Sequence, residues 1–206
     1  MKKWLIDFRL SVILTLILVV LCCGIYPALV WGIARLAFPE KAAGSLIYEN
    51  GKIVGSRLIG QGFSNPAYFH PRPSAAGSGY DATASGGTNF GPLSKKLIDD
   101  VQRRVIEYRQ ENTLSKDEPV PADAVTSSAS GLDPDISIAN ARLQTGRVAR
   151  ERHISDQDVL RLLALHTQGR DLGLFGEPRV NVLVLNLELD HRFGKAAPHS
   201  ANEERK

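Results

Sequence analysis

The feature that most constrains this chain is a long apolar run near its N-terminus. No charged residue occurs between Arg9 and Arg35, and the 22 residues from Leu10 to Trp31 are almost all apolar. A helix of this length, rising about 1.5 Å per residue, spans roughly the 30 Å hydrocarbon core of a bilayer. The run therefore predicts a transmembrane helix over residues 10–34.

A cleaved signal peptide is the alternative explanation of the same run. Lys2 and Lys3 would supply its positively charged start. However, the run is longer than the roughly 7–15 apolar residues of a signal peptide, and no clean Ala-x-Ala cleavage motif follows it. A lipoprotein signal is also disfavoured, because the bulky Leu21 precedes Cys22. The sequence therefore favours a retained membrane anchor.

The charges on the two sides of the helix predict its orientation. Lys2, Lys3 and Arg9 lie on the N-terminal side, against Arg35 and Lys41 on the other. Because cytoplasmic flanks carry the excess of Lys and Arg, we expect the N-terminus in the cytoplasm and the large C-terminal part outside it.

Beyond Pro39 the sequence is that of a water-soluble globular protein. Its charges lie in mixed-sign stretches and the net charge of the chain is only +3, so a nucleic-acid partner is not expected. Cys22 and Cys23, the only two cysteines, both lie in the apolar run. The soluble part therefore has neither a disulfide framework nor a cysteine-based zinc site.

Local patterns in the soluble part predict few strands and several helices. Asn50-Gly51 between two short apolar stretches predicts a β-hairpin, and apolar spacing predicts three helices, over 94–112, 137–152 and 155–167. Residues 61–92 are rich in Gly, Ser, Pro and aromatics and predict a long irregular segment. Alternating leucines predict a last strand over 180–189.

These elements predict an α+β protein in which one N-terminal transmembrane helix precedes one mixed α+β extracytoplasmic domain with few strands. The expected parts are a cytoplasmic N-terminus (1–9), the transmembrane helix (10–34), the soluble domain (38–194) and a flexible polar tail (195–206).

The motifs of common enzymes are missing from the sequence. It contains no G-x-x-x-x-G-K-[ST] phosphate loop and no G-x-S-x-G nucleophile elbow. The five histidines are scattered, without the spacing of metal ligands. We therefore expect no catalytic residue, no metal site and no cofactor of the chain's own.

One glycine-rich segment has the composition of an anion-binding loop. Consecutive glycines expose backbone N–H groups that can cradle a phosphate, and a helix begins shortly afterwards. A plain structural turn explains the same residues. The candidates for nucleotide contact are Ser85, Gly86, Gly87, Thr88 and Asn89.

Two further segments hold charged side chains on a restricted backbone. Arg72 stands next to Pro71 and Pro73, which fix the backbone around it, and can pair with a carboxylate or phosphate or cap internal carbonyls. Asp133 and Asp135 lie in a predicted turn that either attracts cations or forms an Asx turn before the next helix.

These three segments, in this order behind one membrane helix, resemble the C-subunit family of the Kdp potassium-transporting ATPase. The likeness extends from the anchor to about Asp190. The motif residues that carry it, expected to be structural or to form interfaces, include Gln61, Tyr68, Phe69, Arg72, Pro73, Ser74, Ser130, Gly131, Leu132, Asp133, Pro134, Asn181 and Asn186.

The resemblance implies a non-catalytic subunit of a bacterial inner-membrane P-type pump that imports potassium using ATP. Its partners would be a channel-like potassium-binding subunit, an ATP-hydrolysing subunit and a small one-helix subunit. The family's role is described as that of a catalytic chaperone, which raises the ATP affinity of the hydrolysing subunit. Ser85 to Asn89 would then contact ATP shared with that subunit.

The expected orientation conflicts with direct ATP contact, because a loop outside the cytoplasm cannot reach cytoplasmic ATP. The periplasmic explanation is that the domain stabilises the assembly or shapes cation entry. A different class of function is a free-standing, membrane-anchored periplasmic binding module or envelope hydrolase that uses one of the Ser/Asp turns.

The orientation leads to a first testable prediction. A reporter enzyme that is active only outside the cytoplasm should work when fused after Lys206, because the positive flank holds the N-terminus inside. Activity of a cytoplasm-only reporter at the same position would reverse the topology and restore the possibility of direct ATP contact.

Overall fold

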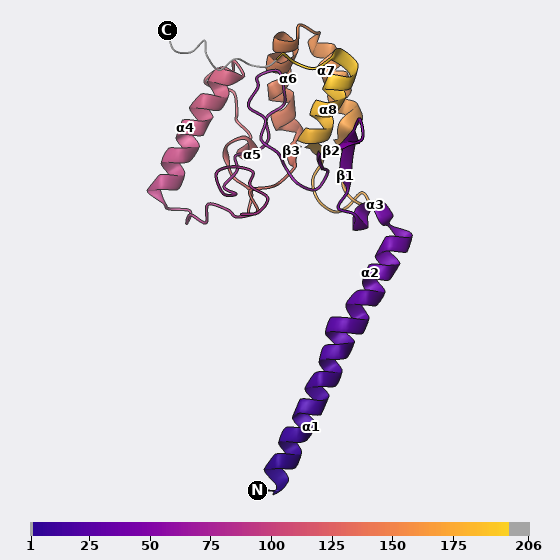
Figure 1. Cartoon of the computed structure of the whole chain (residues 1–206). Coiled ribbons are helices and arrows are strands. Elements are labelled where there is room, and N and C mark those ends of the chain that lie inside the picture. Colours follow the sequence, from indigo (N-terminus) through magenta and orange to yellow (C-terminus); the bar gives the residue numbers. More distant parts are fainter. Residues whose placement is uncertain (1, 198–206) are drawn as a thin grey trace. The chain divides into compact units, whose positions relative to one another are not determined.

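The computed structural model describes residues 2–197, which form two compact units that divide between Val54 and Gly55. Helices dominate and strands are few and short, with one long apolar helix at the N-terminus (Figure 1). The predicted mixed α+β class is therefore confirmed. The predicted domain limits stay predictions, and most of the predicted tail lies outside the described residues.

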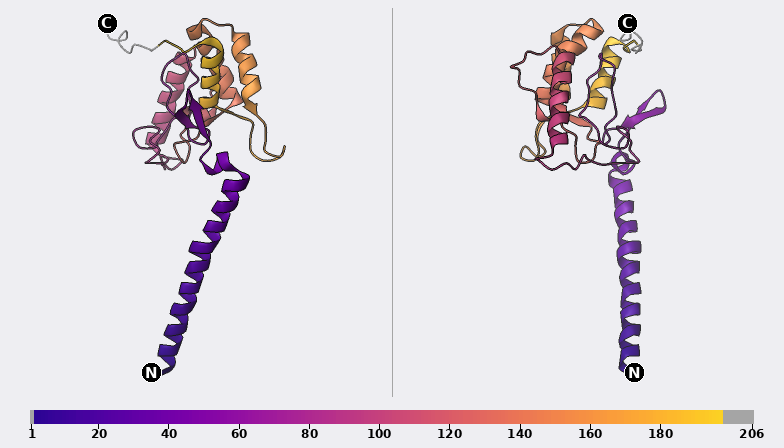
Figure 2. Two further views of the ribbon diagram at one scale, coloured as in Figure 1. Left: turned by 45° about the vertical axis from the view of Figure 1, so that its right-hand side comes forward. Right: turned by 90° about the vertical axis from the view of Figure 1, so that its left-hand side faces the viewer.

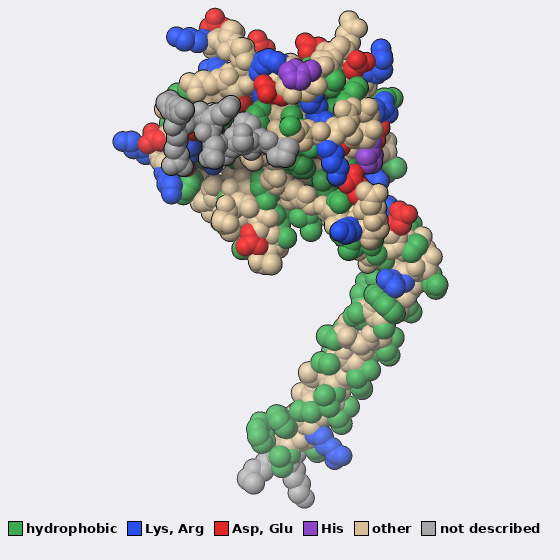
Figure 3. All heavy atoms as spheres, turned by 45° about the horizontal axis from the view of Figure 1, so that its top comes forward, with side chains coloured by type: hydrophobic (Ala, Val, Ile, Leu, Met, Phe, Trp, Pro, Cys, Tyr) green, Lys and Arg blue, Asp and Glu red, His purple; other side chains and the backbone are tan. Residues whose placement is uncertain are grey.

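The N-terminal unit begins with one continuous helix. Its segments are α1 (Lys2–Val19), the π-helical η1 (Val20–Ile25) and α2 (Tyr26–Ala37). The apolar side chains surround this helix and its few charged ones lie toward its ends (Figure 3). Among the described residues it alone is long and apolar enough to cross a membrane, with a mean hydropathy of 2.7. It is compatible with a single-pass anchor.

The widened turn of η1 has a local cause in Pro27. Proline lacks an amide hydrogen, and in a regular helix its ring collides with the carbonyl four residues earlier, which here belongs to Cys23. Cys23 lies within η1, and π-type turns are a common way for a helix to continue past such a defect. The helix therefore keeps its full length.

A short helix and a hairpin follow. They are α3 (Pro39–Ala42), β1 (Leu46–Glu49) and β2 (Lys52–Ser56). β1 pairs with β2, and the turn residues Asn50 (φ 49°) and Gly51 (φ 76°) are both left-handed, as a type I′ turn requires. The predicted hairpin is confirmed.

The C-terminal unit starts with a long irregular segment. Residues 57–94 contain no helix and no extended strand, which confirms the predicted irregular stretch. The helix α4 (Lys95–Glu111) follows, with Ser94 and Asn112 as its flanking cap residues, so the helix predicted over 94–112 is confirmed. The one-turn helix α5 (Ala122–Val125) follows.

A small antiparallel sheet and three helices complete this unit. Strand β5 (Arg179–Asn181) lies between β3 (Asp135–Ser137) and β4 (Thr167–Gln168), with Ile136 opposite Val180. The helices are α6 (Ile138–Arg152), α7 (Asp156–His166) and α8 (Val182–Phe193). Ser137 and Ser155 accept hydrogen bonds from backbone amides of the first turns of α6 and α7, so both of these predicted helices begin at N-caps.

The strand predicted over 180–189 is wrong, because the chain leaves β5 after Asn181 and continues as α8. The residues that α8 buries include Val182, Leu185, Asn186 and Leu189, which have the i, i+3, i+4, i+7 spacing of one helix face. The Asn181 side chain accepts a hydrogen bond from the Val184 amide and caps the helix.

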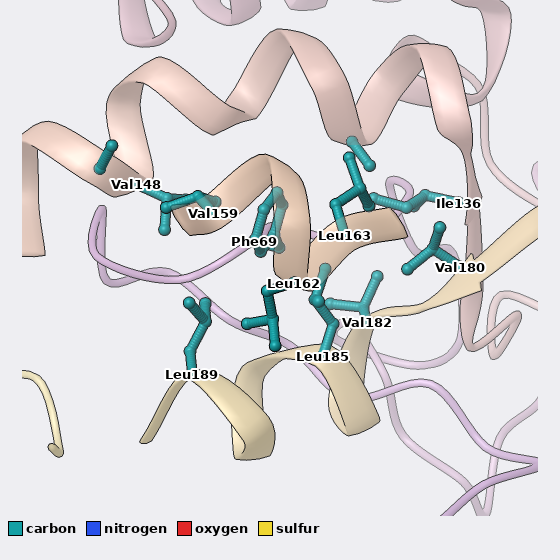
Figure 4. Close-up of a cluster of buried hydrophobic side chains, with 12 residues drawn as sticks. Phe69, Ile136, Val148, Val159, Leu162, Leu163, Val180, Val182, Leu185 and Leu189 are labelled. Atoms are coloured by element: carbon teal, nitrogen blue, oxygen red, sulfur yellow. The ribbon is translucent and has the colours of Figure 1, made fainter. Parts of the chain in front are cut away.

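The hydrophobic core lies between α6, α7, α8 and the sheet. Figure 4 shows Phe69, from the irregular segment, among Val159, Leu162 and Leu185 of α7 and α8. Phe69 is completely buried. The irregular segment is therefore part of the packed unit rather than a linker, and it runs along the helices in the two views of Figure 2.

Candidate functional site

The three sequence motifs meet in space. Ser74 donates from its hydroxyl to the carbonyl of Gly131 (2.7 Å). The Ser85 hydroxyl and the Gly86 amide both donate to the carbonyl of Ser130, each at 2.9 Å. We call the segments 72–76, 85–89 and 128–134 the motif cluster.

Gly131 lies where the three segments of the motif cluster come closest together. It has a φ of +67°, and a Cβ there would stand 2.6 Å from the amide nitrogen of Ala76 and 2.7 Å from the carbonyl oxygen of Gly86. Only glycine allows both the left-handed backbone and this approach. Its place in the cluster is therefore structural.

The two glycines of the candidate anion loop differ in what surrounds them. A Cβ at Gly87 would meet the carbonyl oxygen of Ala129 at 3.0 Å, whereas a Cβ at Gly86 would meet nothing within 4 Å. Neither has a positive φ, while Asn89 does (53°). Thr88 is half-buried. The close approach at Gly87 brings the loop against the Ser128–Gly131 backbone.

Arg72 makes an internal pair. Its guanidinium donates to Asp133 Oδ2 at 2.8 Å, and the hydroxyl of Tyr80 donates to the Arg72 carbonyl. Burial, and then the charge of Asp133, raise the pKa of Tyr80 far above its usual range, so this hydroxyl stays a donor. Asp133 Oδ1 also accepts from the Asp135 amide (3.1 Å), which is the Asx turn expected of that segment.

Other motif residues bind backbone groups or side chains of neighbouring segments. The Leu132 carbonyl accepts from the Gly60 amide (2.8 Å), and the Pro134 carbonyl accepts from the Val182 amide (3.0 Å). The Asn181 amide group donates to the carbonyl of Arg57 (2.9 Å). Gln61 lies beside Gly55, where any side chain would overlap it.

Two side-chain amides bind the irregular segment as a neighbouring strand would. Asn186 accepts from the Phe69 amide and donates to the Phe69 carbonyl, both at 2.9 Å. Gln144 does the same to His70, at 2.7 and 3.0 Å. Asn186 is one of the motif residues named from the family resemblance.

Arg147 is the most deeply placed charged side chain of this region. It is only 2% exposed, and it donates to the carbonyls of Pro66 and Tyr68. It also donates to Asn112 (3.0 Å) and to Gln144 (2.8 Å). Burial lowers the pKa of Arg147. Helix periodicity alone gives no sign of this role, because three of its four partners, Asn112, Pro66 and Tyr68, lie 35 to 81 positions away in the chain.

Glu111 supplies the nearby negative charge. Its carboxylate lies 2.7 Å from His70 Nδ1 and 3.5 Å from Arg147 Nε. Burial raises the pKa of Glu111, but the hydrogen bond and charge of His70, together with Arg147, outweigh it and hold the pKa below its ordinary value. The carboxylate therefore stays ionised beside the buried guanidinium.

Arg152 binds the same stretch from the end of α6. It donates to the Ala67 carbonyl (2.6 Å) and to Asp190 (2.7 Å), and its guanidinium lies 4.6 Å from the centre of the Tyr68 ring. The Tyr68 hydroxyl donates to the same Asp190 carboxylate (2.9 Å). Arg152 and Asp190 thus fix Tyr68, while Asn186 fixes Phe69.

A cleft of about 590 Å³ lies next to the motif cluster. Its lining includes His70, Arg72, Pro73, Ser74 and Glu111, but no residue of the 85–89 loop. The structure therefore brings the three motifs together without placing the glycine-rich loop in this cleft.

Comparison with known proteins gives the family. The family model described as "K+-transporting ATPase, c chain" matches residues 8–191. Two similar proteins are the potassium-transporting ATPase KdpC subunits of Koribacter versatilis and Beijerinckia indica. The first is 52% identical and covers 92% of this chain and 95% of its own. The second is 53% identical and covers 87% and 91%. The KdpC subunit of Mycobacterium tuberculosis H37Rv is 54% identical over 81% of this chain and 88% of its own.

The contacts of Arg147 lead to a second prediction. Arg147→Lys should lower the free energy of unfolding by on the order of 3 kcal/mol, because an ammonium group cannot serve four buried acceptors as a planar guanidinium does. Arg150→Lys on the same helix, where Arg150 is about half-exposed, is the matched control and should stay within about 0.5 kcal/mol of the parent.

Denaturant unfolding of the full chain in detergent, followed by tyrosine near-ultraviolet circular dichroism, measures this difference. Tryptophan fluorescence is unsuitable, because Trp4 and Trp31 both lie in the apolar helix. Equal stability of the two variants would show that Arg147 does not hold the segment.

A third prediction concerns the glycines of the motif cluster. Gly131→Ala should cost on the order of 2 kcal/mol or more, since it combines a left-handed φ with a backbone collision. Gly86→Ala introduces a methyl group into open space and should be nearly neutral. The same unfolding measurement compares them, and a silent Gly131→Ala would contradict the described backbone geometry.

Proposed function

The chain belongs to the KdpC family, and we propose that it serves its potassium pump by stabilising the assembled complex rather than by binding nucleotide itself. As a KdpC subunit it is an accessory subunit of a K+-transporting ATPase. The proposed partners are a channel-like potassium-binding subunit, the ATP-hydrolysing subunit and a small one-helix subunit. The proposed location is the bacterial inner membrane, with the C-terminal unit outside the cytoplasm.

The single observation that carries this proposal is the bonding of the glycine-rich loop. The Ser85 hydroxyl and the Gly86 amide are donors that a phosphate would need, and both already donate to the Ser130 carbonyl. A nucleotide would have to replace this internal acceptor, which costs the hydrogen bonds that close the motif cluster. These internal hydrogen bonds thus support a structural role for the 85–89 loop.

The expected orientation supports the same conclusion. With the positive flank in the cytoplasm, the 85–89 loop and cytoplasmic ATP are separated by about 30 Å of hydrocarbon. We therefore propose that the chain raises the ATP affinity of the hydrolysing subunit indirectly, by keeping the pump in its assembled, binding-competent form. The chain alone hydrolyses no ATP in this proposal.

The hydrolase alternative has no support in the Ser/Asp turns. Ser74 donates to Gly131 and accepts from the amides of Ala76 and Tyr80. Ser130 accepts from the Leu132 amide. Hydroxyls that bind the backbone in this way stabilise turns. Membership of the KdpC family also argues against a free-standing protein, because the family consists of subunits of a potassium-transporting ATPase.

A fourth prediction separates the structural role of the loop from nucleotide contact. Gly87→Ala forces a shift against Ala129 and should lower the yield of the purified pump, while the KM for ATP of the complex that does assemble stays unchanged. Gly86→Ala is the control and should change neither quantity. ATPase kinetics of each purified complex give the measurement.

Two results would reverse the interpretation. A raised KM in fully assembled Gly87→Ala pump would place the loop at the nucleotide. A KM that is the same in pump lacking this chain as in complete pump would remove the indirect effect on ATP affinity.

A further inference from the structure

The loop between β4 and β5 exposes three apolar side chains next to one another. Leu172, Leu174 and Phe175 are 89%, 76% and 64% exposed. Isolated exposed leucines are ordinary on protein surfaces, but three within four residues of one loop are not. We call residues 172–175 the apolar tip. The left view of Figure 2 shows the loop projecting from the helices of the C-terminal unit.

The apolar tip is held in a defined conformation. The amide of Asp171 donates to the Phe175 carbonyl (2.8 Å), and the amide of Phe175 donates to the Asp171 carbonyl (2.9 Å). Leu172 has a φ of +54°, a left-handed backbone that is unfavourable for a residue with a side chain. The fold thus maintains a strained turn that presents apolar side chains to the outside, and a binding partner would explain both features.

The charges beside the tip decide between a lipid and a protein partner. Arg170 pairs with Glu177 (3.1 Å), and Arg179 pairs with Asp171 (3.3 Å). The two basic and two acidic residues beside the tip therefore balance one another, and Arg179, in β5, also pairs with Asp135 (3.2 Å). Segments that enter a bilayer surface carry an excess of Lys and Arg for the anionic headgroups, whereas an apolar centre with a balanced polar rim is typical of protein interfaces.

We propose that the apolar tip inserts into an apolar pocket of a neighbouring membrane-embedded subunit of the pump and anchors the C-terminal unit there. This inference rests on the proposed function, since it requires an assembled complex. The partner surface is a protein pocket lined by aliphatic or aromatic side chains. A few preorganised apolar side chains are enough to dominate such an interface.

A double variant tests the anchor in the assembled pump. Leu174→Ser with Phe175→Ser should reduce the amount of this chain that co-purifies with a tagged partner subunit by on the order of tenfold or more. Leu160→Ser, at an exposed leucine of α7 outside the apolar tip (42%), is the control and should co-purify like the parent. Near-ultraviolet circular dichroism of each full chain checks that the fold is kept.

Photo-crosslinking identifies what covers the tip, even if the double variant fails to fold. With a photoreactive residue in place of Leu174 in the otherwise unchanged pump, mass spectrometry should find the adduct on another pump subunit. Adducts on lipid or on a second copy of this chain would overturn the proposal, as would no adduct together with normal assembly of the double variant. Failure of the unmodified chain to co-purify would instead refute the proposed function itself.

Discussion

Five consecutive backbone carbonyls, those of residues 66–70, each accept a hydrogen bond from a buried or partly buried side chain, and the C-terminal unit depends on this arrangement. Arg147 serves the first and third, and Arg152, Asn186 and Gln144 serve the others. An irregular segment beside the core has no ladder to satisfy its polar groups. Side chains from α6 and α8 take the place of that ladder, and Phe69 can then enter the core.

This binding also positions the motif cluster. Because Gln144 fixes His70, the chain reaches Ser74 from a defined point, and Ser74 then bonds to the Gly131 carbonyl. Arg72 pairs with Asp133 within the same short stretch. Loss of the buried guanidinium of Arg147 is therefore expected to loosen the cluster as well as the core, since polar networks of this kind act together.

Elements governed by nearby residues were predictable from the sequence, and those governed by distant ones were not. The hairpin follows from Asn50-Gly51, and two helices begin at serine caps. In 180–189, leucines at every second position imitate a strand, although the residues that α8 buries fit a helix face; the cap at Asn181 is the signal that distinguishes them. Arg147 has the pattern of an ordinary helix residue, because three of its four partners come from distant parts of the chain.

The glycine-rich loop shows why composition alone cannot separate an anion site from a structural turn. The Ser85 hydroxyl and the Gly86 amide converge on one oxygen, that of the Ser130 carbonyl. A phosphate oxygen would satisfy the same two donors. The sequence of the loop therefore does not distinguish a phosphate from a backbone carbonyl as their acceptor. In the folded chain, the left-handed backbone of Gly131 lets the 128–131 segment approach closely enough to provide the carbonyl acceptor. The segment that provides this internal acceptor therefore lies about 45 positions away from the loop.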